Sequence, residues 1–325
     1  MMKKVSIVMC TYNGAKYLRE QLDTIVQQTY PIHELIIQDD CSTDKTFSIL
    51  EEYSKQYPYI QIHINEQKKG ANQNFFSAIE RITGDYIAFS DQDDIWELDK
   101  IEKQISAIGD FWLSGHFSKP FSEDNVFVFV DTRKPNYGIE RAIYQPSIPG
   151  HTMLLKKEIA ALIPKDSKNT FMYDHLFQIV AAAYDKIFFH EEILTHQRRH
   201  HSAATYTIPL NTKLNLTNCF QAINRTFFLY IELRDALCSR FNEIYKLLKS
   251  LPEESSVKTD AENLAFYQSK KGLIFYLKSA FLCVKLRKKI FYAKEKNNLF
   301  SILRAIYFPI SCVDYIRYMS KTYTH

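Results

Sequence analysis

The most restrictive feature of this sequence is the alternation of apolar runs with helical segments across residues 1–100. Four apolar runs have the length of buried strands, at residues 5–9, 34–38, 60–64 and 86–89. Between the first two runs, apolar residues recur at the spacing of one helix face, at Leu18, Leu22, Ile25 and Val26. Strand–helix alternation of this kind implies right-handed crossovers. We therefore predict an α/β fold, with a mostly parallel sheet that helices cover on both faces.

The rest of the chain continues this pattern more sparsely and then becomes helical. Further strands are expected at residues 126–130, 153–155 and 187–189, and a helix is expected to begin near Asp174. From residue 208 the pattern is helical to the end. Residues 1–207 hold 22 of the 41 basic and 28 of the 37 acidic side chains, which leaves 19 basic and 9 acidic in the remainder. We therefore predict two domains, 1–207 and 208–325, with different partners.

Polar residues gather where three of the predicted strands end, in the segments TYNG, DDCS and SDQDD. Parallel sheets bind ligands outside the carboxyl ends of their strands, so these segments are the candidates for a site. Asp91 and Asp93 stand two residues apart in an extended segment, and both carboxylates therefore face the same side. Such oxygen ligands suit Mg²⁺ or Mn²⁺, which would neutralise a diphosphate. The alternative is an ordinary solvated acidic turn.

The other two strand ends each allow a functional and a structural interpretation. The carboxylate of Asp39 or Asp40 would accept a hydrogen bond from the imide N–H of uracil or thymine. Alternatively, one of them caps the helix expected to begin near Ser42. The segment 11–13 would supply a ring for the base and polar contacts for the ribose, or it forms an ordinary Asn-Gly turn.

Taken in order, these motifs resemble those of family 2 glycosyltransferases, which have the GT-A fold. The resemblance rests on VSIVMCTYNG, ELIIQDDCSTDKT and GDYIAFSDQDDIW, and further on PGHTMLLKKE and MYDHLFQIVAAAYDKIFFHEEILTHQRRHHSAAT. The resemblance covers about residues 4–205. Within the family, the sequence is similar to bacterial members that build polysaccharides, rhamnosyltransferases among them. The resemblance implies a nucleotide-diphospho-sugar transferase fold with a Rossmann-like sheet, followed by a helical C-terminal region.

The resemblance also assigns residues to the nucleotide-sugar donor and to a metal ion. The donor-binding residues would be Thr11, Tyr12, Asn13, Asp39, Asp40, Asp91, Arg198 and His200. Within this set Asp40 matches the carboxylate that reads the base. Asp93, together with Asp91, matches the ligands of a Mn²⁺ or Mg²⁺ cofactor. Cys41 departs from the family, which commonly has glycine or asparagine at that position.

The same resemblance implies a catalytic base and an acceptor contact. Asp174 matches the base, although it stands in Tyr-Asp-His rather than in the more familiar Glu-Asp, and an N-capping role is the alternative. His151 is a candidate for contacting the acceptor, or it is a packed structural histidine. Arg198 and its neighbours form a basic segment whose guanidinium groups suit phosphate oxygens.

The implied reaction is an inverting single displacement by a metal-dependent hexosyl- or rhamnosyltransferase. A UDP- or dTDP-sugar would donate the sugar to a hydroxyl of a glycan or lipid-linked saccharide acceptor. Two rival functions are a catalytically inactive nucleotide-sugar-binding module and a sugar-nucleotide nucleotidyltransferase. The second would be expected to carry a glycine-rich phosphate loop where this chain has TYNG.

The basic C-terminal region allows two interpretations. Its apolar-rich stretches 272–286 and 299–319 are interrupted by charged residues, so neither is expected to span a bilayer. The region either docks on an anionic membrane surface or packs as a helical domain with solvated lysines. It contains no recognised nucleic-acid-binding module. Scattered cysteines and an N-terminus without a signal-peptide pattern favour a cytoplasmic protein, peripheral to the membrane if the region docks.

Overall fold

The computed structural model describes residues 2–123, 128, 133–201, 216–252, 256–291 and 298–315. The chain forms two compact units, and each is described by itself. The first unit comprises residues 1–132, 148–181 and 186–200, and the second comprises 133–147, 182–185 and 201–325. The predicted domain boundary at residue 207 and most of the strand expected at 126–130 lie outside the described residues.

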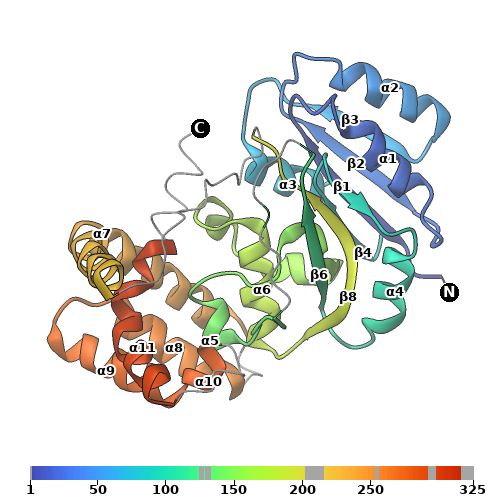
Figure 1. The fold of residues 1–325 in the computed structure, drawn as a ribbon. Coiled ribbons are helices and arrows are strands. Elements are labelled where there is room, and N and C mark those ends of the chain that lie inside the picture. The colour runs from blue at the N-terminus through green and yellow to red at the C-terminus, as the bar shows by residue number, and fades with distance from the viewer. Residues whose placement is uncertain are drawn as a thin grey trace. The chain divides into compact units, whose positions relative to one another are not determined.

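The first unit is built on one eight-stranded sheet (Figure 1). Its parallel half has the order β3-β2-β1-β4, formed by β1 (Val5–Thr11), β2 (Glu34–Asp39), β3 (Ile60–Ile64) and β4 (Tyr86–Ser90). The intervening helices are α1 (Leu18–Val26), α2 (Thr46–Gln56) and α3 (Ala71–Ile79). The parallel strands and their helices are confirmed, because apolar runs buried on both faces leave a strong signal in the sequence.

The other half of the sheet is mixed. Here β7 (Leu154–Lys156) pairs antiparallel with β4 and with β6 (Leu113–Phe121). Next to β6 lies the parallel strand β8 (Ile187–Arg198). The short strand β5 (Ile95–Trp96) pairs antiparallel with β8 and forms the edge of the sheet. The long strand β6 was not predicted, because LSGHFSKPF lacks both an apolar run and a clean alternation. The strand β8 is longer than the strand expected at 187–189 and ends at Arg198, within the basic segment.

Helices cover both faces of the sheet, as predicted. On one face, α1, α2 and α4 (Lys100–Ala107) enclose the apolar core with the side chains of β1 and β2. On the other face, the ring of Phe89 packs against Phe75 of α3 and against Tyr173 and Phe177 of α6 (Tyr173–Ala183). Because β1 and β4 are buried on both sides, they form a rigid base for the residues at their carboxyl ends.

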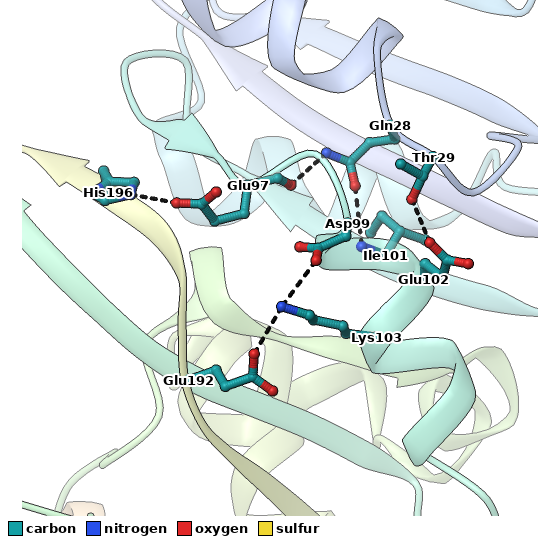
Figure 2. A network of polar contacts seen from close by, with 9 residues as sticks. All are labelled: Gln28, Thr29, Glu97, Asp99, Ile101, Glu102, Lys103, Glu192 and His196. Carbon is teal, nitrogen blue, oxygen red and sulfur yellow. Dashed lines mark hydrogen bonds and ion pairs between the residues drawn. The ribbon is translucent and has the colours of Figure 1, made fainter.

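A network of polar contacts fixes the turn between β5 and α4 (Figure 2). Beyond the end of α1, the amide of Gln28 donates to the carbonyl of Glu97 (2.8 Å) and accepts from the backbone N–H of Ile101 (3.1 Å). The hydroxyl of Thr29 donates to Glu102 (2.7 Å). Since the first N–H groups of a helix lack partners within it, Gln28 serves as a cap supplied from another element.

Ion pairs join the same turn to β8 (Figure 2). Lys103 lies between two carboxylates, Asp99 at 2.9 Å and Glu192 at 2.8 Å. His196 of β8 contacts Glu97 at 2.7 Å. The turn that follows the acidic segment after β4 is therefore held on two sides, by α1 and by β8.

The second unit is helical. Besides the short α5 (Ile139–Ala142), it contains α7 (Leu216–Ser250), α8 (Thr259–Gln268), α9 (Leu273–Lys285), α10 (Arg287–Ile290) and α11 (Asn298–Ser311). Its interior is formed by apolar side chains such as Phe241, Leu264, Cys283 and Phe291. Among the described residues, no helix combines the length and the apolar character needed to cross a bilayer.

Candidate functional site

Asp39 ties the carboxyl end of β2 to the end of β1. Its Oδ1 accepts from the hydroxyls of Thr11 (2.7 Å) and Ser42 (2.6 Å), and its Oδ2 accepts from the backbone N–H of Ser42 (2.8 Å). The helix expected to begin near Ser42 starts only at Thr46, and Ser42 belongs to this turn. With both oxygens engaged, Asp39 shapes the site in this structure, and its contact with the donor stays a prediction.

Asp40, the predicted base reader, is buried under the loop between β3 and α3. Its Oδ1 accepts from the amide of Asn65 and the backbone N–H of Lys69, both at 2.7 Å, and its Oδ2 accepts from the N–H of Gly70 at 2.9 Å. A carboxylate oxygen can accept more than one hydrogen bond, so Oδ2 keeps acceptor capacity for a ligand. Asp40 therefore connects the loop to the place predicted for the base.

Gln92 joins the acidic segment after β4 to the end of β1. Its amide accepts from the backbone N–H of Tyr12 (2.9 Å) and donates to the carbonyl of the same residue (3.1 Å). A Cβ atom at Gly14 would lie 2.1 Å from the Gln92 Oε1, so a larger residue there would displace the Gln92 amide. Asn13 adopts a positive φ of 46° and accepts from the N–H of Thr43 (2.8 Å), which supports the predicted turn. The ring of Tyr12 is 41% exposed at this edge.

Three carboxylates cluster after β4: Asp91, Asp93 and Asp94. The enclosure of Asp91 and the charges of Asp93 and Asp174 raise its pKa to about 7. Burial and the charges of Asp91 and Asp93 raise the pKa of Asp94 well above its usual range. Like charges in a poorly solvated site oppose one another's ionisation, so this cluster favours a bound cation.

Asp174 lies in the first turn of α6 and was predicted as the catalytic base. Its Oδ1 accepts from the backbone N–H of His175 (2.7 Å), and the N–H of Gly150 also bonds to it. Burial outweighs these bonds and raises the pKa of Asp174 to about 6. A Cβ at Gly150 would lie 2.1 Å from the hydroxyl of Tyr173, so glycine lets the segment 149–151 pass closely over the helix start.

His151 follows in that segment and is buried beside the acidic cluster. One ring nitrogen lies 3.0 Å from the Ser118 hydroxyl, and the other lies 3.7 Å from Asp91 Oδ2. Burial, with the positive charges of Lys100 and Arg199, lowers the pKa of His151 to about 3. The imidazole is therefore neutral at physiological pH and has a lone pair for a cation or a hydroxyl.

The basic segment at the end of β8 contacts the acidic cluster directly. The guanidinium of Arg198 pairs with Glu20 and Glu123 and donates to the carbonyl of Asp93 (3.0 Å), while its backbone N–H donates to Asp94 (3.1 Å). Arg198 is thus buried as a support of this segment, and its predicted contact with a diphosphate stays a prediction. His200 places Nε2 2.8 Å from Asp93 Oδ2.

The side chains of Asp91, Asp94 and His151 fit a divalent cation. One ligand atom from each lies within 4.8 Å of the others. The Asp94 Oδ2 is buried and has no hydrogen-bond partner among the described residues. Carboxylates with an imidazole suit a metal such as Mn²⁺. Asp94 stands in the SDQDD segment, but the sequence assigned it no role, and its burial is what distinguishes it. Asp93 is paired with His200 here, and its role as a ligand stays a prediction.

Residues 6–157 match the family described as Glycosyl transferase family 2. The chain is similar to the dTDP-rhamnosyl transferase RfbG of Shigella flexneri, at 34% identity over 163 residues that span 46% of this chain and 54% of RfbG. It is also similar to TuaG of Bacillus subtilis, named for teichuronic acid biosynthesis, at 41% identity over 101 residues that span 31% of this chain and 40% of TuaG. The chain thus covers about half the length of these relatives.

Solved structures with the same fold extend over nearly the whole chain. The S. aureus TarS 1–349 structure in complex with UDP-GlcNAc has a TM-score of 0.55 at 15% identity, and covers 99% of this chain and 93% of that one. The structure of the mannosyltransferase PcManGT of Pyrobaculum calidifontis, in complex with GDP-Man and Mn²⁺, has a TM-score of 0.50 at 15% identity. The match covers 94% of this chain and 86% of PcManGT. These likenesses confirm the predicted GT-A fold with a helical C-terminal region.

Proposed function

Since residues 6–157 of this chain carry a domain of glycosyl transferase family 2, we propose that it transfers a sugar from a nucleotide diphosphate to a hydroxyl. The donor is a UDP- or dTDP-sugar, and the acceptor is a glycan or lipid-linked saccharide in the synthesis of a cell-surface polysaccharide. The names of RfbG and TuaG support a hexosyl or rhamnosyl donor and a polysaccharide product. Free cysteines among the described residues support action in the reducing cytoplasm.

One observation supports this function above the others. Asp91, Asp94 and His151 bring ligand atoms within 4.8 Å of one another at the carboxyl edge of a parallel sheet. This is the edge at which α/β sheets bind nucleotides. When bound there, Mn²⁺ or Mg²⁺ would neutralise charge on the diphosphate leaving group. The Mn²⁺ held by PcManGT supports such an ion.

The remaining residues position the reactants and move one proton. The ring of Tyr12 and the carboxylate of Asp40 hold the base, and Thr11 and Asn13 shape the turn beside it. Asp174 accepts the proton of the acceptor hydroxyl as its oxygen forms a bond to the sugar C1. The bond from C1 to the diphosphate oxygen breaks on the opposite face, so the anomeric centre is inverted.

The donor site is tested by thermal unfolding with UDP, dTDP or GDP, each with and without Mn²⁺. A ligand that binds only the folded state adds about 2.7 kcal/mol at a hundredfold excess over its Kd. We expect UDP or dTDP to raise the melting temperature in the presence of Mn²⁺. Asp91→Asn and Asp94→Asn should each abolish this rise, because each removes a charged ligand. Asp110→Asn, an exposed aspartate outside the cluster, is the matched control.

Turnover distinguishes the transferase from a binding module without activity. Asp174→Asn should keep the nucleotide-dependent rise in melting temperature and lose release of UDP or dTDP from the sugar nucleotide. A folded wild-type protein that no nucleotide stabilises would contradict the donor site. Binding without any release of nucleotide diphosphate, with acceptor saccharides present, would favour the binding module.

A further inference from the structure

The second unit exposes an unusual amount of apolar surface. Among the described residues, nineteen large apolar side chains are exposed, and twelve of them lie on α7, α9 and α11. They are Ile223, Phe227, Phe228, Ile231, Leu273, Ile274, Leu277, Phe281, Leu299, Phe300, Leu303 and Ile306. Each helix contributes one strongly exposed phenylalanine, with Phe228 at 70%, Phe281 at 74% and Phe300 at 66%. Scattered apolar residues need no explanation, but a concentration of this size indicates an interaction surface.

These residues form one stripe on each helix, opposite its buried side. On α9 the exposed residues lie at positions 273, 274, 277 and 281, which fall within about 100° of the helix circumference. The buried residues of that helix, Ser279, Ala280, Leu282 and Cys283, lie on the other side. A helix that is apolar all round normally has something to cover its outer face.

Two tyrosine hydrogen bonds hold the three helices side by side. The hydroxyl of Tyr276 on α9 donates to the carbonyl of Ile306 on α11, at 3.0 Å. The hydroxyl of Tyr307 on α11 donates to the carbonyl of Ile223 on α7, also at 3.0 Å. Ile306 and Ile223 also carry exposed side chains, so α11 presents exposed apolar residues where it contacts each neighbour. We call the exposed apolar residues of the three helices together the apolar face.

Basic residues are concentrated in the segment that contains α9. From residue 264 to residue 291 the chain contains seven basic residues and no acidic residue. Lys270 and Lys278 lie over the rings of Phe266 and Tyr267, at 5.3 and 5.6 Å, and form no ion pair within the described part of the chain. Three other lysines of the segment are partly compensated by acidic partners, Lys271 by Asp235 at 2.5 Å, Lys285 by Asp260 at 3.5 Å and Lys289 by Glu140 at 2.6 Å.

We propose that the apolar face docks on the surface of an anionic lipid bilayer. The exposed phenylalanine, leucine and isoleucine side chains enter the boundary between headgroups and acyl chains, and the lysines beside them contact lipid phosphates. A second copy of the chain is the less suitable occupant, because a symmetric dimer through this face would bring the same basic residues together. The charge therefore selects an anionic partner.

A groove at the border of the apolar face suits a lipid headgroup. It lies between α8 and α9, has a volume of about 280 Å³, and is lined by Asp260, Asn263, Tyr267, Lys278, Phe281, Leu282 and Lys285. The Asp260 carboxylate is paired with Lys285 at 3.5 Å. Ammonium groups and an exposed ring in one groove match a phosphate attached to an acyl chain. This inference does not depend on the donor site, because all its residues belong to the second unit.

The test is flotation of the full-length chain with vesicles of phosphatidylcholine alone or of phosphatidylcholine with phosphatidylglycerol. We expect binding to the anionic vesicles, weakened by salt. Phe228→Ser, Phe281→Ser and Phe300→Ser combined should lower that binding by about tenfold or more, because three apolar insertions are removed. Lys270→Gln with Lys278→Gln should lower binding to anionic vesicles only.

The matched control combines Phe47→Ser, Ile64→Ser and Leu98→Ser, which change exposed apolar residues of the first unit. It should bind vesicles as the wild type does. Circular dichroism would check that each variant is folded. We expect the phenylalanine variant to fold, because its three phenylalanines are exposed. Equal vesicle binding by the phenylalanine variant and the wild type would overturn the proposal. The proposal would also be overturned if the wild type did not bind vesicles but formed a dimer that the phenylalanine variant cannot form.

Discussion

At the scale of single residues, hydrogen bonding separates the aspartates that shape the site from those available for chemistry. Asp39 has both oxygens engaged by Thr11 and Ser42. Asp94 has one buried oxygen without a hydrogen-bond partner among the described residues. Asp174 accepts hydrogen bonds from backbone N–H groups, yet burial still raises its pKa to about 6. Identical side chains therefore have different tasks because of their surroundings.

The pKa of Asp174 sets a pH dependence for the proposed reaction. The raised pKa means that the carboxylate, the form able to accept a proton, predominates only above about pH 6. We expect kcat/KM to rise with pH through about 6 and then to level off, as measured by release of the nucleotide diphosphate. Asp174→Asn should lower the rate by about a hundredfold or more and remove this rise. A pH profile that is flat from 5 to 8 would contradict the role of base.

At the scale of elements, the loops after the strands are fixed by partners distant in sequence. The helix α4 begins without a side-chain cap of its own, and Gln28 from the end of α1 binds the N–H of Ile101 in its first turn. The acidic cluster is connected to this turn through β5. The position of the cluster therefore depends on a contact between α1 and α4 that periodicity does not reveal (Figure 2).

Gln28→Ala should therefore destabilise the first unit. The substitution removes three hydrogen bonds, those to the carbonyls of Thr24 and Glu97 and to the N–H of Ile101, and leaves these three backbone groups without this partner. We expect a loss of about 1–3 kcal/mol in the free energy of unfolding, measured in urea. Lys103→Gln removes two partly exposed ion pairs and should cost less than about 1 kcal/mol. A larger loss for Lys103→Gln than for Gln28→Ala would contradict this ranking.

At the scale of the whole molecule, the two units differ in composition and in their spectroscopic signals. The first contains the sheet, and the second consists of helices with a basic, apolar exterior. Both tryptophans of the chain, Trp96 and Trp112, belong to the first unit. Tryptophan fluorescence therefore follows unfolding of the unit that carries the proposed donor site.

We expect a bound nucleotide to act unequally on the two signals. UDP or dTDP with Mn²⁺ should raise the denaturant midpoint seen by tryptophan fluorescence, because it binds the folded first unit. The midpoint seen by circular dichroism at helical wavelengths should rise less, because the second unit contributes much of that signal. Asp94→Asn should abolish the difference. Identical shifts in both signals would show that the units unfold as one and would contradict the expectation.

The parallel half of the sheet, its covering helices and the resemblance to glycosyl transferase family 2 could all be predicted from the sequence. Residues 5–9 and 86–89 lie in strands buried on both faces, so their apolar runs are visible without any partner. The acidic segment was found for the same reason, since it follows directly from a predictable strand.

The contacts of the polar residues follow from tertiary packing and could not be predicted from the sequence. Asp94 has a buried oxygen without a partner among the described residues. Arg198 pairs with Glu20, and His151 lies close to Asp91. Both contacts join segments far apart along the chain. The structure also showed that the apolar stripes of α7, α9 and α11 are exposed and that α11 contacts both other helices. Periodicity records which side of an element is apolar, because that depends on neighbours within one helix or strand. Contacts between elements depend on packing in three dimensions, which local spacing does not encode.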